Sequence, residues 1–329
     1  MKCIKKAKKL FWKKISELVK AHDWDRKAAA KGWFTPKVIV RMDGGLASQM
    51  NFFAVGYAAA KKAGLPLYLD VTWFEKNGKD LNGIDNRGFN LFNAFPRIRE
   101  QYGDRLVTKK SISPMFMRLF SDSYDQREYT DYRPEAFTDR SMYLDSYYAD
   151  IRYIASEQSD LRKLMSFNQQ LTDEDKELQT GIMGSTSCAL HIRRGDFCGT
   201  IHEVCTEKYY TNAIARMREL HPDVVFYVFT NDEAWTENFL RPLQTGNEFK
   251  ILKNRSESNP VTDMQLMSEC KHAIISNSGF SFFPAFLTYD EHKHVIMPEI
   301  WFNGALREQS RDMCYMPGWI RISVDWQLH

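Results

Sequence analysis

The residues best suited to bind phosphate form the segment His191-Ile192-Arg193-Arg194-Gly195-Asp196, which lies where a predicted buried strand ends and the chain turns. Each arginine carries a permanent charge and a rigid fork of N–H donors that matches phosphate oxygens. Because adjacent arginines at a strand end are poor core residues, the pattern favours a diphosphate partner. In the alternative, the arginines pair with Asp196 and nearby acids as a surface cluster that contributes little stability.

A second group combines Asp263 with the later segment Ser276-Asn277-Ser278, which lies between a predicted strand and a predicted helix. The start of a helix offers unpaired backbone N–H groups and a positive dipole end, which together bind phosphate. A carboxylate such as Asp263 can accept hydrogen bonds from guanine N1–H and its amino group, a donor pair that adenine lacks. The alternative is that Ser276, Ser278 and Asp263 only cap helices.

A third group is the turn Asp43-Gly44-Gly45, followed by Gln49 inside a predicted helix. The glycines let the backbone approach a ligand closely, and Gln49 offers a directed polar contact. The turn lacks the spacing of a dinucleotide-binding fingerprint. Asp43 is our candidate for the base that activates an acceptor hydroxyl, and the alternative is that it caps the turn.

These groups need parallel strands that end at one edge of a sheet. The run Val38-Ile39-Val40, a helix over 46–63 and a strand over 65–69 predict a βαβ unit, whereas residues 72–150 receive no detailed assignment. From Cys188 onward, strands and helices alternate again, with a strand over 188–192, a helix over 207–220 and a strand over 224–230. We predict an α/β fold with two facing Rossmann-like domains and parallel sheets, whose cleft binds ligands at the strand ends.

The predicted domains are a basic N-terminal segment over 1–34, an acceptor-side domain over 35–185 and a nucleotide-side domain over 186–329. Residues 1–20 contain eight lysines and one glutamate, so they hold a net charge of +7 in a chain whose total is +3. Their apolar residues recur at helical spacing, which is typical of a helix on an anionic membrane. The alternatives are a solvated helix, or packing of Phe11 and Trp12 on the main body.

Other features narrow the function classes. The six cysteines show no paired spacing, and no run approaches the roughly 20 apolar residues of a spanning helix, so we expect a cytoplasmic protein, peripheral on the inner membrane face. The eight histidines form no spaced pair that indicates zinc. Asp173-Glu174-Asp175 has the form of a metal-binding Asp-x-Asp motif but is expected to start a helix. We expect neither a metal nor nucleic acid as partner.

In order and spacing, the three groups together resemble the bacterial α-1,2-fucosyltransferases of glycosyltransferase family 11. Two further segments add to the resemblance, Phe229-Thr230-Asn231-Asp232 and Pro298 with Trp301-Phe302, so that it spans roughly residues 37–305. The chain departs from the family pattern at Ala47-Ser48 and over 279–284, positions that affect the sugar contacts.

The resemblance implies a GT-B-type enzyme without metal that transfers L-fucose, with inversion, from GDP-fucose to galactose O2 of a glycan. It implies that His191 and Asp263 hold guanine, that Arg193 binds the β-phosphate and that Arg194 supports it. Ser276, Asn277 and Ser278 would complete the diphosphate pocket. The rival functions are a transferase for another sugar nucleotide or linkage, and a glycan- or nucleotide-binding module without turnover.

Overall fold

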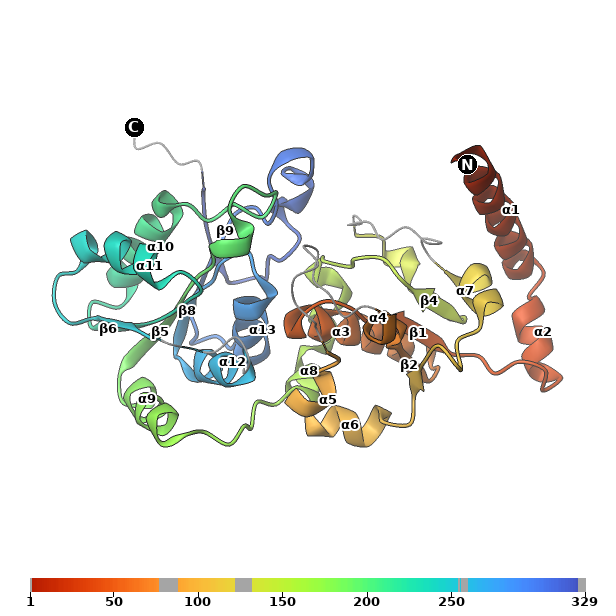
Figure 1. The fold of residues 1–329 in the computed structure, drawn as a ribbon, viewed down its shortest axis with the longest axis horizontal. Helices are drawn as coiled ribbons and strands as arrows, with labels where there is room; N and C mark the ends of the chain where they lie inside the picture. Colours follow the sequence, from red (N-terminus) through yellow and green to blue (C-terminus); the bar gives the residue numbers. More distant parts are fainter. Residues whose placement is uncertain (1, 77–87, 122–131, 254, 256–259, 325–329) are drawn as a thin grey trace. The chain divides into compact units, whose positions relative to one another are not determined.

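The computed structural model describes residues 2–76, 88–121, 132–253, 255 and 260–324 of the chain. It divides into two compact units, Met1–Glu157 and Gln158–His329 (Figure 1). Each unit is an α/β structure around a parallel sheet, which confirms the predicted fold class.

The first unit contains a four-stranded sheet in the order β3-β2-β1-β4, and all of its neighbouring strands are parallel. In the register, Val38 lies opposite Leu67 on one side and Met142 on the other. Its helices and strands are α1 Lys2–Ala21, α2 Trp24–Ala30, β1 Val38–Arg41, α3 Leu46–Ala63, β2 Leu67–Asp70, α4 Thr72–Lys76, α5 Leu91–Ala94, α6 Pro96–Tyr102, β3 Leu106–Val107, α7 Pro114–Phe120 and β4 Met142–Leu144.

Helix α3 packs closely on β1 and β2, and its bounds match the helix predicted over 46–63. The approach depends on Gly56, because a Cβ atom there would lie 2.7 Å from Val40 Cγ1 and 2.9 Å from Leu67 Cδ1. The helix ends at Gly64, whose φ of +64° is the left-handed conformation that glycine adopts without strain. The Asp43-Gly44-Gly45 turn is therefore held at the carboxyl end of β1.

The N-terminal helices belong to the first unit, which corrects the prediction of a separate segment over 1–34. Val19 of α1 is buried in a cluster with Phe116 and Phe120 of α7, and the Ser16 hydroxyl donates to the Leu119 carbonyl over 2.6 Å. The α1 residues Phe11 and Trp12 differ: Phe11 is exposed, whereas Trp12 lies under the Arg118 guanidinium. Apolar burial along the last two turns of α1 thus attaches the helix to the unit.

The second unit contains a six-stranded parallel sheet in the order β10-β9-β8-β5-β6-β7. Side chains alternate along β5: Leu190 points into a core with Tyr210 of α10, whereas His191 contacts Ser281 of α13. The helices and strands are α8 Gln158–Leu164, α9 Asp173–Met183, β5 Thr186–Ile192, α10 Glu207–Leu220, β6 Val224–Thr230, α11 Glu233–Leu240, β7 Phe249–Ile251, α12 Pro260–Glu269, β8 His272–Ile274, α13 Gly279–Thr288, β9 Val295–Pro298 and β10 Ile320–Ile322.

The boundary between the units precedes α8, so the prediction of a boundary after residue 185 is wrong. Helix α8 packs on α13, where Gln158 and Arg162 donate to the carbonyls of Phe286 and Leu287. Helix α9 packs on α12 and β5. The boundary was predicted from the polar residues 171–187, which instead contain helix α9. Among the described residues, no helix has the length and apolar character needed to cross a bilayer.

Candidate active site

The second unit offers a ligand site where its strand order reverses. Strands β5 and β8 are neighbours, but the chain leaves β5 toward β6 and leaves β8 toward β9, on opposite sides. In open parallel sheets, ligands bind at the carboxyl ends of the strands that flank such a reversal. The two segments that end there are the arginine loop, residues 193–197, and the serine loop, residues 275–278. Both were predicted from the sequence to bind diphosphate.

The arginine loop is fixed in place by Asn231, which follows β6. The Arg194 backbone N–H donates to Asn231 Oδ1 over 2.9 Å, and the Arg193 N–H donates to the Tyr210 hydroxyl over 3.3 Å. Gly195 has a φ of +44°, and a Cβ atom there would lie 2.6 Å from Asn231 Nδ2. The close turn requires glycine, and it aims both arginine side chains from one short segment.

The two arginine side chains are partly paired and keep unused donors. Arg193 Nη2 lies 2.8 Å from an Asp196 carboxylate oxygen, so the predicted alternative of a pair with Asp196 is present. The Arg194 guanidinium stacks over the Trp235 ring at 4.1 Å and lies 3.6 Å from Asp232. Within the described part of the chain, the buried Nε atom of Arg193 has no hydrogen-bond partner, and that of Arg194 has only the 3.6 Å ion pair with Asp232, which is longer than a hydrogen bond. Such donors are costly to leave unpaired, which favours an anionic ligand at this loop.

His191 is a buried residue near the end of β5, and its side chain contacts the serine loop. Its Nδ1 lies 2.8 Å from the hydroxyls of both Ser276 and Ser281. Burial, with a smaller contribution from the Arg193 charge, lowers the pKa of His191 to about 3. The ring is therefore neutral at physiological pH, and its observed role is to fix the two serines.

The serine loop joins β8 to α13, and its three polar residues have different roles. Ser278 caps α13 by accepting from the Phe280 N–H over 3.3 Å, as the capping alternative predicted. Ser276 is fully buried beside His191. The Asn277 amide donates to the His202 and Trp301 carbonyls over 2.9 and 3.0 Å, so it anchors the loop. Of the three, Ser278 at the helix start keeps the greatest exposure.

Asp263 lies in the first turn of α12 and forms an ion-pair network with two other residues. The Arg255 guanidinium lies between the carboxylates of Asp263 and Asp175, at 2.5 and 2.6 Å. Burial raises the pKa of Asp263 against the opposing effect of Arg255. Asp175 is also held by Thr172, the N-cap of α9, which confirms that Asp173-Glu174-Asp175 starts a helix. No pattern in the sequence indicated Arg255 as the partner of Asp263.

The first unit has a similar reversal between β1 and β4. Gly44 has a φ of +68° and Gly45 is the N-cap of α3, so the predicted glycine turn is present and follows the buried Asp43. Asp145, which follows β4, is also buried and accepts from Ser121 over 3.1 Å. Sequence analysis did not single out Asp145, because strand β4 itself lies in the stretch that lacked a clear pattern.

Gln49 does not offer the predicted ligand contact. Its amide nitrogen donates to the carbonyls of Gly44 and Gly88, each over 3.0 Å. Its oxygen accepts from the N–H groups of Asn90 and Leu91 over 2.9 and 3.0 Å. The side chain is fully buried, and all of its donors and acceptors are used within the unit. Gln49 therefore attaches residues 88–91 to the glycine turn.

Three histidines form a cluster that sequence spacing did not indicate. His221, His272 and His294 place one ring nitrogen each within 4.8 Å of one another. They lie at the amino ends of β6, β8 and β9, the sheet edge opposite the arginine loop. Burial and the neighbouring histidines and lysines lower the pKa of His272 to about 4. The adjacent Lys271 and Lys293 place positive charge beside the cluster, which opposes a cation.

Comparison with known proteins places this chain among carbohydrate-transferring enzymes. The model of glycosyl transferase family 11 matches residues 104–323, more than half of the chain. The chain belongs to glycosyl transferase family 11. The matched range includes the arginine loop, Asp263 and the serine loop. The predicted family is thereby confirmed, and the protein is a glycosyltransferase.

Among its relatives is an Escherichia coli protein named alpha-1,2-colitosyltransferase, 28% identical over 87% of this chain and 98% of that protein. Another is the Escherichia coli O-antigen biosynthesis glycosyltransferase WbnK, 27% identical over 85% of this chain and 99% of that protein. The mouse galactoside 2-alpha-L-fucosyltransferase Sec1 is 24% identical over 44% of this chain and 40% of its own length.

Solved structures with a similar fold include POFUT1 in complex with GDP, with a TM-score of 0.47 and 10% identity, covering 79% of this chain and 98% of that chain. The α-1,6-fucosyltransferase NodZ, soaked with GDP-fucose, has a TM-score of 0.40 and 15% identity, covering 77% of this chain and 92% of that chain.

Proposed function

We propose that this glycosyltransferase moves L-fucose from GDP-fucose to a glycan hydroxyl, O2 of a galactose residue, with inversion at the anomeric carbon. The observation that carries the proposal is the buried, unpartnered Nε donor of Arg193, beside Arg194, whose buried Nε makes only a 3.6 Å ion pair with Asp232, at the strand reversal. A diphosphate supplies the oxygen acceptors for these donors, and guanidinium groups bind phosphate strongly. The fucosyl donor is supported by relatives named as galactoside fucosyltransferases.

In the proposed reaction, the acceptor oxygen attacks the anomeric carbon of fucose from the side opposite to GDP. A bond forms between these two atoms while the bond from the anomeric carbon to the β-phosphate oxygen breaks, and its electron pair leaves with GDP. The acceptor hydroxyl loses its proton to a base. Arg193 stabilises the negative charge that grows on the β-phosphate, and Arg194 supports it. Fixed cationic donors of this kind contribute a large part of catalysis, on the order of a hundredfold or more in rate each.

For nucleotide recognition we propose that Asp263 accepts from guanine and that Ser278, at the start of α13, contacts the diphosphate. The Arg255 guanidinium donates a hydrogen bond to Asp263. To recognise guanine, this carboxylate would therefore have to accept hydrogen bonds from Arg255 and from guanine at the same time. His191, Ser276 and Asn277 hold the serine loop in position through the contacts described above. Asp263→Asn would weaken discrimination between GDP and ADP, measured by thermal shift with each nucleotide. Unchanged discrimination would remove Asp263 from guanine recognition.

For proton removal we propose Asp43 as the base. It lies at the strand reversal of the first unit and precedes the glycine turn. General-base catalysis contributes about 10²–10⁴-fold in rate, so Asp43→Asn should lower kcat by about that factor. Asp145→Asn, at the neighbouring strand end, is the matched variant. A larger loss of kcat for Asp145→Asn than for Asp43→Asn would assign the base to Asp145.

GDP-colitose should be compared directly with GDP-fucose as the donor, because a relative that aligns with most of this chain is named a colitosyltransferase. Colitose is the 3-deoxy form of fucose, so a GDP-colitose site differs only in the contacts to one hydroxyl. The test is GDP release from GDP-fucose and GDP-colitose with β-galactoside acceptors, followed by linkage analysis of the product. Preference for GDP-colitose, or for a UDP or ADP sugar, would overturn the fucose assignment. Stabilisation by GDP without turnover would instead indicate a binding module.

We further propose that the enzyme is cytoplasmic and contacts anionic membranes through residues 1–20. Each lysine near such a surface contributes about 1 kcal/mol at modest salt, and salt screens the attraction. Because the end of α1 packs on α7, replacement of Lys13 and Lys14 by glutamine is a better test than deletion of the helix. Co-sedimentation with anionic vesicles should weaken in the variant and in high salt. No vesicle binding by the unaltered protein at low salt would refute the contact.

A further inference from the structure

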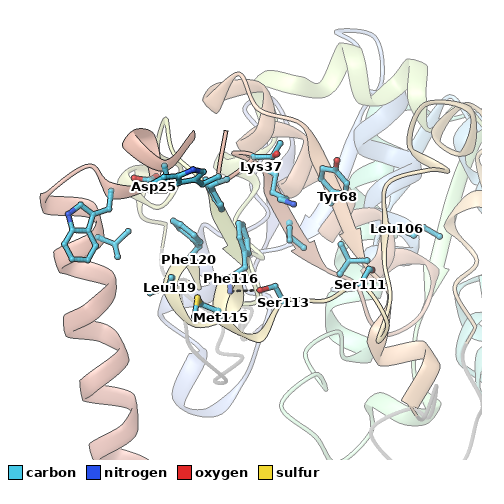
Figure 2. A pocket seen from close by; sticks show the side chains of 18 residues that line it. Asp25, Lys37, Tyr68, Leu106, Ser111, Ser113, Met115, Phe116, Leu119 and Phe120 are labelled. Atoms are coloured by element: carbon cyan, nitrogen blue, oxygen red, sulfur yellow. Dashed lines mark hydrogen bonds between the residues drawn. The ribbon is translucent and has the colours of Figure 1, made fainter. Parts of the chain in front are cut away.

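The first unit contains an apolar pocket that neither the family 11 site nor the proposed reaction uses. It has a volume of about 590 Å³, within the range of roughly 300–1,000 Å³ typical of sites for small ligands. Figure 2 shows it between the sheet and α7, with Phe116 and Phe120 on one wall and Tyr68 and Leu106 on another. The pocket therefore lies on the face of the sheet opposite α3.

The rim of this pocket is unusually apolar for a surface. Eight large hydrophobic side chains are exposed among the described residues, and six of them lie on or near the N-terminal helices and α7. Trp24, Trp33 and Met115 line the pocket and are 55%, 77% and 63% exposed. The other three, Leu10, Phe11 and Leu18, lie along one side of α1 by their helical spacing. Exposed apolar side chains gathered around a pocket mark a binding site, and tryptophans favour the membrane interface.

Charge gives the pocket a preference for an anion. Asp25 lines it, but the Arg140 guanidinium pairs with that carboxylate. Lys37 also lines it, and its ammonium lies 5.3 Å from the Tyr68 ring centroid and 5.9 Å from that of Phe116, between the two rings (Figure 2). In the part of the chain that the structure describes, no carboxylate pairs with Lys37. Arg140 thus neutralises Asp25, whereas no carboxylate of the described residues neutralises Lys37. An anionic head group would therefore be attracted to Lys37.

We infer that this pocket binds the acyl chain of an anionic membrane lipid, with the head group at Lys37. The inference deepens the membrane contact of the proposed function and rests on it for the source of the lipid. Lysines of α1 would attract the protein to the surface, and the pocket would then take one chain from the bilayer. Binding through the pocket should resist salt, because it depends on burial of methylene groups, whereas binding through the lysines alone should not.

The first experiment measures the pocket without membranes or sugars, so its outcome is independent of the transferase assignment. A dansylated fatty acid is titrated into the protein below its micelle concentration, and its fluorescence is followed. Ala28→Phe fills the pocket from α2, whereas Ala30→Phe adds the same ring at an exposed position of that helix. Exclusion of even two methylenes weakens binding about tenfold, so only Ala28→Phe should lose affinity by that factor or more. Equal binding by the two variants, or none by the unaltered protein, would overturn the inference.

The second experiment tests Lys37 and the lipid source. The unaltered protein should prefer the fatty acid to its uncharged methyl ester, and Lys37→Met should remove that preference, while Lys27→Met on the exposed side of α2 should retain it. With vesicles of phosphatidylglycerol and phosphatidylcholine, the salt-resistant part of co-sedimentation should disappear in Ala28→Phe alone. Fatty-acid binding without any salt-resistant vesicle binding would refute a membrane lipid as occupant. Equal thermal midpoints of the variants establish that each one folds.

Discussion

The strand reversals of the two units are built alike, but the polar side chains beside them differ in whether their hydrogen bonds are made inside the protein. In both units a strand ends at the reversal and a glycine with positive φ turns the chain, Gly44 in the first and Gly195 in the second. At the first, the buried amide of Gln49 satisfies four backbone groups. At the second, the buried Nε donors of Arg193 and Arg194 make no hydrogen bond within the described residues, and that of Arg194 has only a 3.6 Å ion pair with Asp232.

The difference teaches how to separate a residue that builds a site from one that binds a ligand. A buried polar group whose hydrogen bonds are all made internally contributes to stability, and its loss leaves partners unsatisfied. A buried donor without a partner contributes only when a ligand supplies the acceptor. Gln49 should therefore affect unfolding, and Arg193 should affect turnover.

Arg193→Ala should have the largest effect on activity. It removes the donor that we propose binds the leaving phosphate, so kcat/KM should fall about a hundredfold or more, with little change in the free energy of unfolding. Arg193→Lys should also be impaired, because an ammonium group cannot reproduce the guanidinium fork. The measurement is GDP release with a saturating acceptor.

A matched control for Arg193 is available in α10. Arg216 pairs with Glu219 three residues later, as Arg193 pairs with Asp196, but it is a surface residue. Arg216→Ala should leave turnover within about twofold, since exposed ion pairs contribute little. Near-normal turnover in Arg193→Ala would remove this residue from the leaving-group role.

Gln49→Leu should lower stability and not turnover, the reverse of the effect expected for Arg193→Ala. It buries an apolar side chain among two carbonyls and two N–H groups that lose their partner, so the free energy of unfolding should fall by about 2–5 kcal/mol. Asn51→Ala, which loses one bond to the Tyr148 carbonyl, should cost about 1 kcal/mol. Urea unfolding measures both. If kcat per folded molecule falls more in Gln49→Leu than in Asn51→Ala, Gln49 has a role in the reaction after all.

The pH dependence of stability should report on His191. Its pKa is about 3 when folded, against 6.5 in an exposed histidine, so below pH 6.5 the unfolded chain binds a proton that the folded chain does not. Stability is thus fully present above pH 6.5 and is lost as the pH falls toward 3, by at most about 1.4 kcal/mol per pH unit from this group. Urea unfolding at several pH values should show a shallower slope in His191→Asn. The exposed His292→Asn is the control, and equal slopes in the two variants would refute the assignment.

Regular periodic segments made much of the fold predictable from the sequence. Helices over 46–63 and 207–220 and the strand over 224–230 have the predicted bounds because caps and apolar spacing agree there. Strands β3 and β4 were missed, since two or three residues are too few for a period to show. The arginine and serine loops were found by residue type. Their partners Asn231, Tyr210 and Arg255 were not assigned roles, because contacts made between distant segments leave no local pattern.

The smallest expected effect is that of metal removal, and the comparison of sites explains why. Two arginines and the start of α13 can neutralise a diphosphate, and Asp175 is engaged by Arg255 and Thr172. Activity should therefore change less than about twofold in EDTA.

The histidine cluster lies at the opposite sheet edge, so a metal bound there would act through stability rather than chemistry. His272→Gln, assayed with and without EDTA, separates the cases. Loss of turnover in EDTA that persists in His272→Gln and is restored by Mn²⁺ would overturn metal independence and return attention to Asp173 and Asp175. Loss of turnover seen only while His272 is present would instead assign a structural ion to the cluster and leave the arginine mechanism intact.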